Sequence, residues 1–124
     1  MHVVKFDEKT FQKRHTKEFR RHEESLVNND QAEAALVVVV RLAHGEGIVS
    51  HKHEDKEEIY LFLEGKAKMR INEEERIVEK ETLIYIPRNA THQLDVIGEN
   101  GVKYISIGIW PEGGKPTETH LIAE

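Results

Sequence analysis

Hydrophobic and polar residues alternate in short blocks along the middle of this chain, and these blocks predict β-strands rather than helices. Residues 36–42 are all valine or leucine except Arg41, which predicts a strand buried on both faces. Residues 59–63 are apolar, include two aromatic side chains and are soon followed by Gly65. We therefore expect a buried strand that ends in a turn at this glycine.

The same pattern of short strands continues toward the C-terminus. Further strands are predicted over residues 66–71, 82–86, 91–97 and 102–110. Pro87 ends the second of these, because proline cannot donate a hydrogen bond to a neighbouring strand. Many short strands separated by turn signals indicate an all-β sandwich or barrel.

The first 33 residues show the weakest pattern. Basic residues are concentrated between Lys13 and His22, which predicts a solvated surface segment, and an arm that reaches a partner subunit is the alternative. We divide the chain into an N-terminal arm over residues 1–33, a β-barrel core over residues 34–110 and a C-terminal tail over residues 111–124.

Composition narrows the class of protein. A chain of 124 residues is large enough for one domain with a single core. Its net charge of −5 argues against a nucleic-acid partner, which usually binds a basic face. The absence of cysteine excludes disulfides and thiolate metal sites, and a cytoplasmic location is expected. The longest apolar run, residues 34–40, is too short to cross a membrane.

Three side chains close together in the sequence can bind a metal. His51 and His53 are two residues apart, so they point to one face if they lie on a strand. Glu58 begins the next predicted strand and could bring a carboxylate to the same point. Imidazole and carboxylate ligands together suit zinc and the first-row transition metals.

The spacing around these residues resembles the first motif of the cupin family. That motif is Gly, five residues, His-x-His, three or four residues, Glu, six residues and Gly. Gly45, His51, His53, Glu58 and Gly65 match every position. Because the family allows either spacing before the glutamate, Glu57 is the alternative to Glu58. Only Glu58 leaves six residues before Gly65 and shares the strand face of Tyr60.

A second segment resembles the second cupin motif in part. Pro87 and His92 match its proline and histidine, whereas Glu81 and Asn89 stand where glycine is usual and Val96 replaces the closing asparagine. The resemblance implies a double-stranded β-helix, or jelly-roll barrel. It also implies one divalent transition metal (Mn, Fe, Ni, Zn, Co or Cu), whose expected ligands are His51, His53, Glu58 and His92.

Three imidazoles and one carboxylate leave one or two coordination positions open, as in catalytic sites. We therefore expect a metal-dependent enzyme, dioxygenase-like or decarboxylase-like, that acts on a small organic substrate. A non-catalytic small-molecule-binding or sensor cupin is the alternative. Tyr60 and Tyr104 are the candidate proton donors, although aromatic residues at such positions commonly pack in the core. No second carboxylate or lysine is clearly placed to act as a general base.

Strand parity predicts the walls of the pocket and its outer contacts. The expected wall is mostly apolar, which favours oxygenation of an aromatic or enolic substrate; it comprises Tyr60, Phe62, Met69, Leu94, Val96, Tyr104 and Ser106. Arg41 would hold a substrate anion if it faced inward, and would otherwise form an ion pair at a strand end or an interface. The apolar residues on both faces of segment 59–63 predict a homodimer that pairs sheet against sheet.

Overall fold

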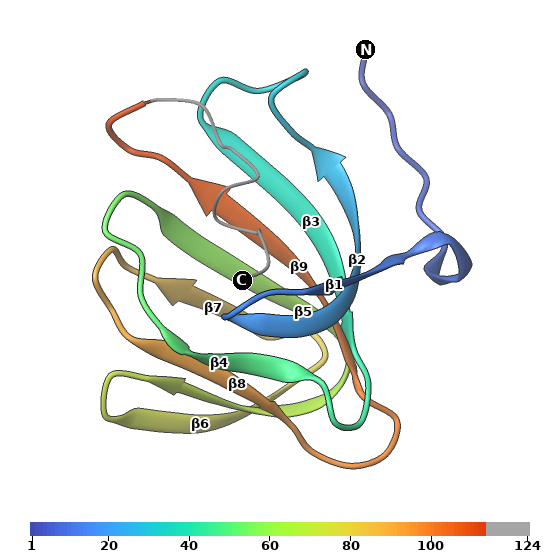
Figure 1. The fold of residues 1–124 in the computed structure, drawn as a ribbon, viewed down its shortest axis with the longest axis vertical. Coiled ribbons are helices and arrows are strands. Elements are labelled where there is room, and N and C mark those ends of the chain that lie inside the picture. The colour runs from blue at the N-terminus through green and yellow to red at the C-terminus, as the bar shows by residue number, and fades with distance from the viewer. Residues whose placement is uncertain (114–124) are drawn as a thin grey trace.

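The computed structural model describes residues 1–113 and shows an almost entirely β-structured chain (Figure 1). A short 3₁₀-helix, η1 (Glu8–Thr10), precedes the strands. The strands are β1 (Gln12–His15), β2 (Phe19–Val27), β3 (Ala35–Leu42), β4 (Gly47–His51), β5 (Glu57–Ile71), β6 (Glu74–Glu79), β7 (Leu83–Ile86), β8 (His92–Val96) and β9 (Val102–Ile109). The predicted all-β barrel is therefore confirmed.

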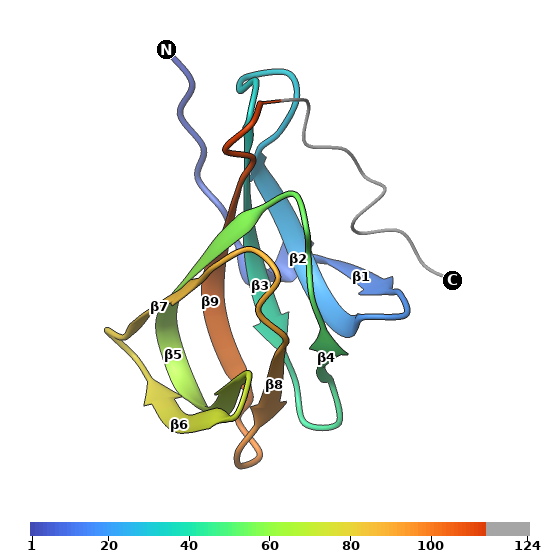
Figure 2. The same ribbon diagram turned by 90° about the vertical axis from the view of Figure 1, so that its left-hand side faces the viewer.

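Six strands close the barrel in the order β2, β3, β9, β5, β8, β4, and β4 returns to β2. Figure 2 shows β4 beside the start of β2, where the ring closes, with β1 on one side of the molecule and β6 and β7 on the other. The pairings given for these strands are antiparallel. Closure leaves no free edge among the six strands, while β1, β6 and β7 extend the sheet outside the ring.

The longest strand, β5, changes its neighbouring strands along its length. Its first half pairs with β7 and β9, and its second half pairs with β6 and β8. The register with β9 shifts between Phe62 and Glu64, and Gly65 has a φ of 85°. The predicted turn at Gly65 is therefore wrong: the glycine serves a bulge inside a continuous strand, where it permits the bend.

Alternation along the strands separates a buried core from an outer face. Val38, Val40, Phe62 and Tyr104 face inward on β3, β5 and β9 and are at most 2% exposed. The intervening positions of β9 and of the first half of β5 are half-buried. The strand over residues 36–42 is confirmed as β3, and Arg41 is half-buried on its outer side.

The interpretation of the basic stretch between Lys13 and His22 as a solvated surface segment is wrong for the inward-facing residues of β2. Phe19, Arg21 and Glu23 alternate inward along β2 and are 4–5% exposed. The basic composition hid this alternation, because two of the three inward residues are charged. Residues 111–113 follow the last strand, and the remainder of the predicted tail, residues 114–124, lies outside the described residues.

No helix within residues 1–113 is long and apolar enough to cross a membrane.

We expect Gly65→Ala to destabilise the fold far more than Gly98→Ala. Both glycines have a φ near 85°, but a Cβ at Gly65 would overlap the carbonyl oxygen of Gly101 and lie 2.8 Å from Val102 Cα, whereas nothing lies within 4 Å at Gly98. Both variants should lose about 1 kcal/mol from the left-handed backbone, and Gly65→Ala should lose about 1–3 kcal/mol more from overlap. Urea unfolding measures both; equal losses would contradict this account of the bulge.

Candidate metal centre

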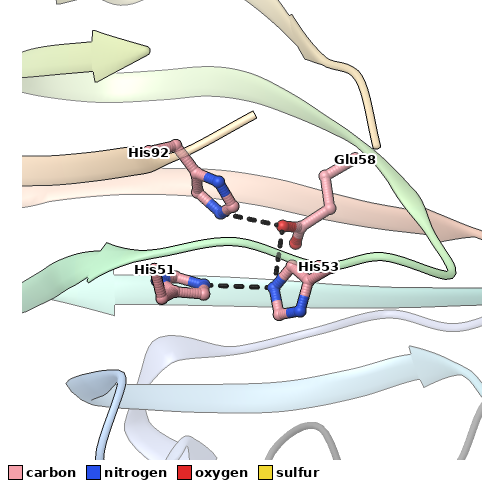
Figure 3. A group of neighbouring side chains, drawn as sticks. All are labelled: His51, His53, Glu58 and His92. Atoms are coloured by element: carbon pink, nitrogen blue, oxygen red, sulfur yellow. Dashed lines mark hydrogen bonds and ion pairs between the residues drawn. The ribbon is translucent and has the colours of Figure 1, made fainter. Parts of the chain in front are cut away.

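Four side chains from three parts of the barrel converge at one point (Figure 3). His51 ends β4, His53 follows in the next loop, Glu58 lies near the start of β5 and His92 begins β8. Each offers one ligand atom, and these four atoms all lie within 4.8 Å of one another. The structure therefore brings together the four residues that the sequence predicted.

The two histidines on neighbouring strands meet because of strand register. His51 and His92 are paired across β4 and β8, and their ring centroids are 4.2 Å apart. The Nδ1 atom of His51 lies 2.7 Å from the carbonyl oxygen of Val49, and Nδ1 of His92 lies 3.0 Å from that of Ala90. Because a carbonyl only accepts, each Nδ1 carries the proton and each Nε2 keeps a lone pair directed at the cluster.

His53 reaches the cluster from a loop rather than from a strand. The expectation that it shares a strand with His51 is wrong, since β4 ends at His51. The backbone N–H of Asn89 donates to the carbonyl oxygen of His53 over 2.7 Å and ties two loops together. His53 Nε2 lies 3.1 Å from His51 Nε2 and 3.4 Å from Glu58 Oε1, which joins both sides of the cluster.

Two residues that depart from the second motif retain the backbone conformation that its glycines allow. Asn89 has a φ of 67° and Glu81 has a φ of 65°. Asparagine visits this left-handed region more readily than other non-glycine residues do, whereas glutamate pays the full steric cost. The backbone N–H of Glu81 donates to the carbonyl oxygen of Phe62 over 2.8 Å, which secures the turn to β5.

The Glu58 carboxylate is buried and charged. Burial alone would raise its pKa, but the Lys56 ammonium, 3.7 Å from Oε2, and the adjacent imidazoles of His53 and His92 hold the pKa well below its usual range. Lys56 is itself 4% exposed and lies beside the ring of Trp110. This lysine therefore fixes the carboxylate in its ionised form.

The imidazole of His51 is held neutral. Burial, together with the nearby His92, lowers the pKa of His51 to about 4, and the bond to Val49 opposes the shift. A neutral imidazole is the form that ligates a metal.

The cluster fits a metal ion on the evidence of its unsatisfied atoms. Glu58 Oε1 and His92 Nε2 are buried, lack a hydrogen-bond partner within the described chain and lie only 3.1 Å apart. Ligand atoms about 2.1 Å from a shared ion lie about 3.0–4.2 Å from one another, which matches the closest separations seen here. A cation between these atoms would satisfy both of them.

The cavity beside the cluster is more polar than expected. Its lining includes Glu18, Arg21, Lys56, Tyr60 and Ser106, of which only the last two were predicted. Four expected wall residues, Phe62, Met69, Leu94 and Tyr104, are instead buried in the core, and Val96 packs against it. The apolar pocket is therefore a wrong prediction, and so is the absence of a nearby lysine and second carboxylate. Glu18 Oε2 lies 3.7 Å from His51 Nε2.

The two candidate tyrosines occupy different places. Tyr60 lines the cavity, while Tyr104 lies deeper and its buried hydroxyl has no hydrogen-bond partner in the described residues. Burial raises the pKa of both phenols; nearby Glu58 adds to the shift at Tyr60, whereas nearby Arg21 opposes it at Tyr104. Both phenols therefore remain protonated, so neither serves as a base.

Glu57 and Arg41 lie on the outer face, away from the cluster. The Glu57 carboxylate accepts a hydrogen bond from the Tyr85 hydroxyl. Arg41 donates to the carbonyl oxygen of Asn100 over 2.5 Å and forms ion pairs with Glu8 and Glu64. Of the two interpretations of Arg41, the ion pair at a strand end is confirmed.

Comparison with known proteins places this geometry in context. A family model described as a cupin domain matches residues 38–108. An uncharacterized protein of Methanocaldococcus jannaschii is 35% identical over 74 residues, which make up 60% of this chain and 59% of that relative. The match therefore spans less than two thirds of the relative's length.

Solved structures confirm the predicted jelly-roll barrel. A predicted oxalate decarboxylase from Thermotoga maritima superposes with a TM-score of 0.74 at 16% identity, over 86% of this chain and 99% of that one. A cupin-like protein from the same organism gives a TM-score of 0.72 at 20% identity, over 96% of this chain and 95% of that one. At these identities the likeness carries the fold alone.

Proposed function

The chain belongs to the cupin domain family, and from this membership we propose that it is a metal-dependent enzyme acting on a small organic substrate. In this proposal His51, His53, Glu58 and His92 bind one divalent transition metal. The observation that carries it is the pair of buried, unsatisfied atoms, Glu58 Oε1 and His92 Nε2, inside a four-residue ligand cluster.

A bound divalent metal would supply a Lewis acid for a substrate oxygen. Three imidazoles and a carboxylate accept Mn, Fe, Ni, Zn, Co or Cu, and availability as well as affinity selects among these ions.

The protein's own residues would prepare this site for a substrate. The carbonyl oxygens of Val49 and Ala90 fix the orientation of two imidazoles, and Lys56 holds the Glu58 carboxylate. Glu18 lies at the partly exposed side of the cavity, with a side chain 31% exposed. From there its carboxylate can accept a proton from a bound substrate.

Decarboxylase-like and dioxygenase-like reactions both remain within the proposal. An apolar pocket would favour oxygenation, but the lining of this cavity includes the charged side chains of Glu18, Arg21 and Lys56. Decarboxylation is named in the description of one similar Thermotoga maritima structure. A non-catalytic binding or sensor role is the second candidate, supported by an enclosed space of about 20 Å³, which is about the room that one water needs.

We further propose a homodimer through the outer face of the sheet. Cross-strand pairing aligns apolar residues over four strands there: Leu83 and Tyr85 of β7, Ile59 and Leu61 of β5, Ile105 and Ile107 of β9, and Val37 of β3. Leu83 and Tyr85 are 58% and 50% exposed, and such a continuous patch is typical of an interface. The cytoplasmic location and the absence of a nucleic-acid partner stay predictions.

Replacing Glu58 should remove the metal, and replacing Glu57 should not. We expect Glu58→Gln and His92→Ala to fall from about one ion per chain to below about 0.1, because each loses a buried ligand. Glu57→Gln, the matched control one residue away on the outer face, should keep its ion. Elemental analysis of untagged, metal-loaded protein measures the occupancy. Full occupancy in Glu58→Gln, with folding verified by circular dichroism, would contradict the ligand assignment.

Turnover distinguishes the enzyme from the binding module. The manganese, iron and nickel forms should release CO₂ or consume O₂ with at least one member of a panel of small acids, catechols, flavonols and diketones. The same assay with Glu58→Gln should show no activity above the buffer. Saturable binding without turnover by any metal form would support the sensor role and overturn the enzyme.

The proposed dimer predicts a solution mass of about twice 14.4 kDa. Leu83→Glu should shift the protein toward monomer, because it places a charge in the apolar face. Ile77→Glu is the control, since Ile77 is 57% exposed but lies on the β6 hairpin opposite Lys68. Light scattering at micromolar concentration measures the mass of each protein in solution. A monomeric wild-type protein would rule out this dimer.

A further inference from the structure

A buried arginine lines the cavity beside the ligand cluster. Arg21 enters the barrel from β2 and is 5% exposed. Its Nε–H donates to Glu23 Oε1 over 2.8 Å, and its guanidinium carbon lies 3.7 Å from the centre of the Phe19 ring. The guanidinium is thus held in place from two sides, at the wall that also includes His51, His53 and Glu58.

The buried charges balance only while the site holds no cation. Among the described residues, the buried charged side chains are Arg21 and Lys56, which are positive, and Glu23 and Glu58, which are negative. A divalent ion on the cluster would leave an excess of two positive charges in the interior. Glu18, at the rim, offsets only one of them. An excess of buried charge is costly, so the metal-loaded site favours an anionic ligand.

The size of the enclosed space limits which part of a ligand can enter. About 20 Å³ is little more than the room for one water, so only the end group of a ligand can enter, and the remainder of the molecule would stay at the side where Glu18 and His51 are partly exposed. A carboxylate is small, planar and singly charged, and it matches the fork of N–H donors on a guanidinium.

We propose that Arg21 is the carboxylate-recognition residue of this site and that its substrate or ligand is a small organic acid. The inference rests on the proposed metal site and adds the chemical class of the ligand. The carboxylate enters between Arg21, Lys56 and the metal-ligand cluster. The guanidinium remains available for it because the bond to Glu23 engages one of five N–H donors.

A purely structural ion pair is the competing explanation, and it makes a different prediction. If Arg21 only neutralises Glu23, replacing both by apolar residues of similar size should leave ligand binding unchanged. If Arg21 recognises a carboxylate, the same double replacement should weaken the binding of acids and spare neutral ligands.

The test measures binding rather than turnover, with zinc-loaded full-length protein. Calorimetry gives dissociation constants for oxalate and for acetate and its neutral isostere acetamide. We expect wild-type protein to prefer acetate over acetamide. Arg21→Met/Glu23→Met, which leaves no stranded buried charge, should bind oxalate at least about tenfold more weakly, the loss expected for a charge-assisted hydrogen bond.

Arg41→Met is the matched control, because Arg41 also forms ion pairs but lies on the outer face. It should bind oxalate within about twofold of wild type. Elemental analysis of each sample distinguishes a failure of the proposed metal site from a failure of the role proposed for Arg21. A wild-type protein that takes up no metal overturns the proposed function and this inference with it. A metal-loaded, folded double variant that binds oxalate as tightly as wild type overturns the role of Arg21 alone.

Discussion

The structure depends on burying the ionised carboxylate of Glu58 inside a closed sheet. An isolated buried charge is costly, and the chain offsets that cost with the Lys56 ammonium, while imidazoles from two other segments surround the carboxylate. These groups come together only if β4, β5 and β8 meet at one end of the barrel. The requirement thus links the fold to the site: the strands that close the sheet also assemble the ligand cluster.

Closure depends in turn on a strand that changes partners along its length. β5 places Glu58 near its beginning, bends at Gly65 and pairs its second half with β8, the strand that begins with His92. One continuous backbone thus fixes the carboxylate and, through register, the distant imidazole. Positive φ angles at Gly45, Gly65, Glu81 and Asn89 mark the places where the chain bends around this arrangement.

The resemblance to two cupin motifs was sufficient to predict the four-residue cluster, because His51, His53 and Glu58 match the first motif and His92 matches the histidine of the second. The choice of Glu58 over Glu57 followed from strand parity, and the outward position of Glu57 agrees with it. Inference from the sequence failed where tertiary pairing decides the outcome. Glycine is typical of turns, yet Gly65 lies within a strand because the two halves of β5 that flank it pair with different strands.

The first 33 residues also show that tertiary pairing limits inference from the sequence. Arg21 and Glu23 resemble solvated charges in sequence, because only the pairing of β2 with β3 and β4 turns them inward. Lys56 was overlooked for a similar reason: its burial comes from Trp110, far along the chain. A hydrophobic pattern does not detect a charged residue that faces inward. The spacing of Phe19, Arg21 and Glu23 at every second position was nevertheless consistent with a strand.

Arg21 and Glu18 lie outside residues 38–108, the segment matched by the family model, whereas all four clustered residues lie within it. Two separate stretches of chain therefore build the cavity, one shared with the family and one contributed by the N-terminal strand. Substitutions at Glu18 or Arg21 would thus change part of the cavity lining without changing the four clustered residues. In this barrel, part of the lining and the whole cluster are encoded in separate segments of a single domain.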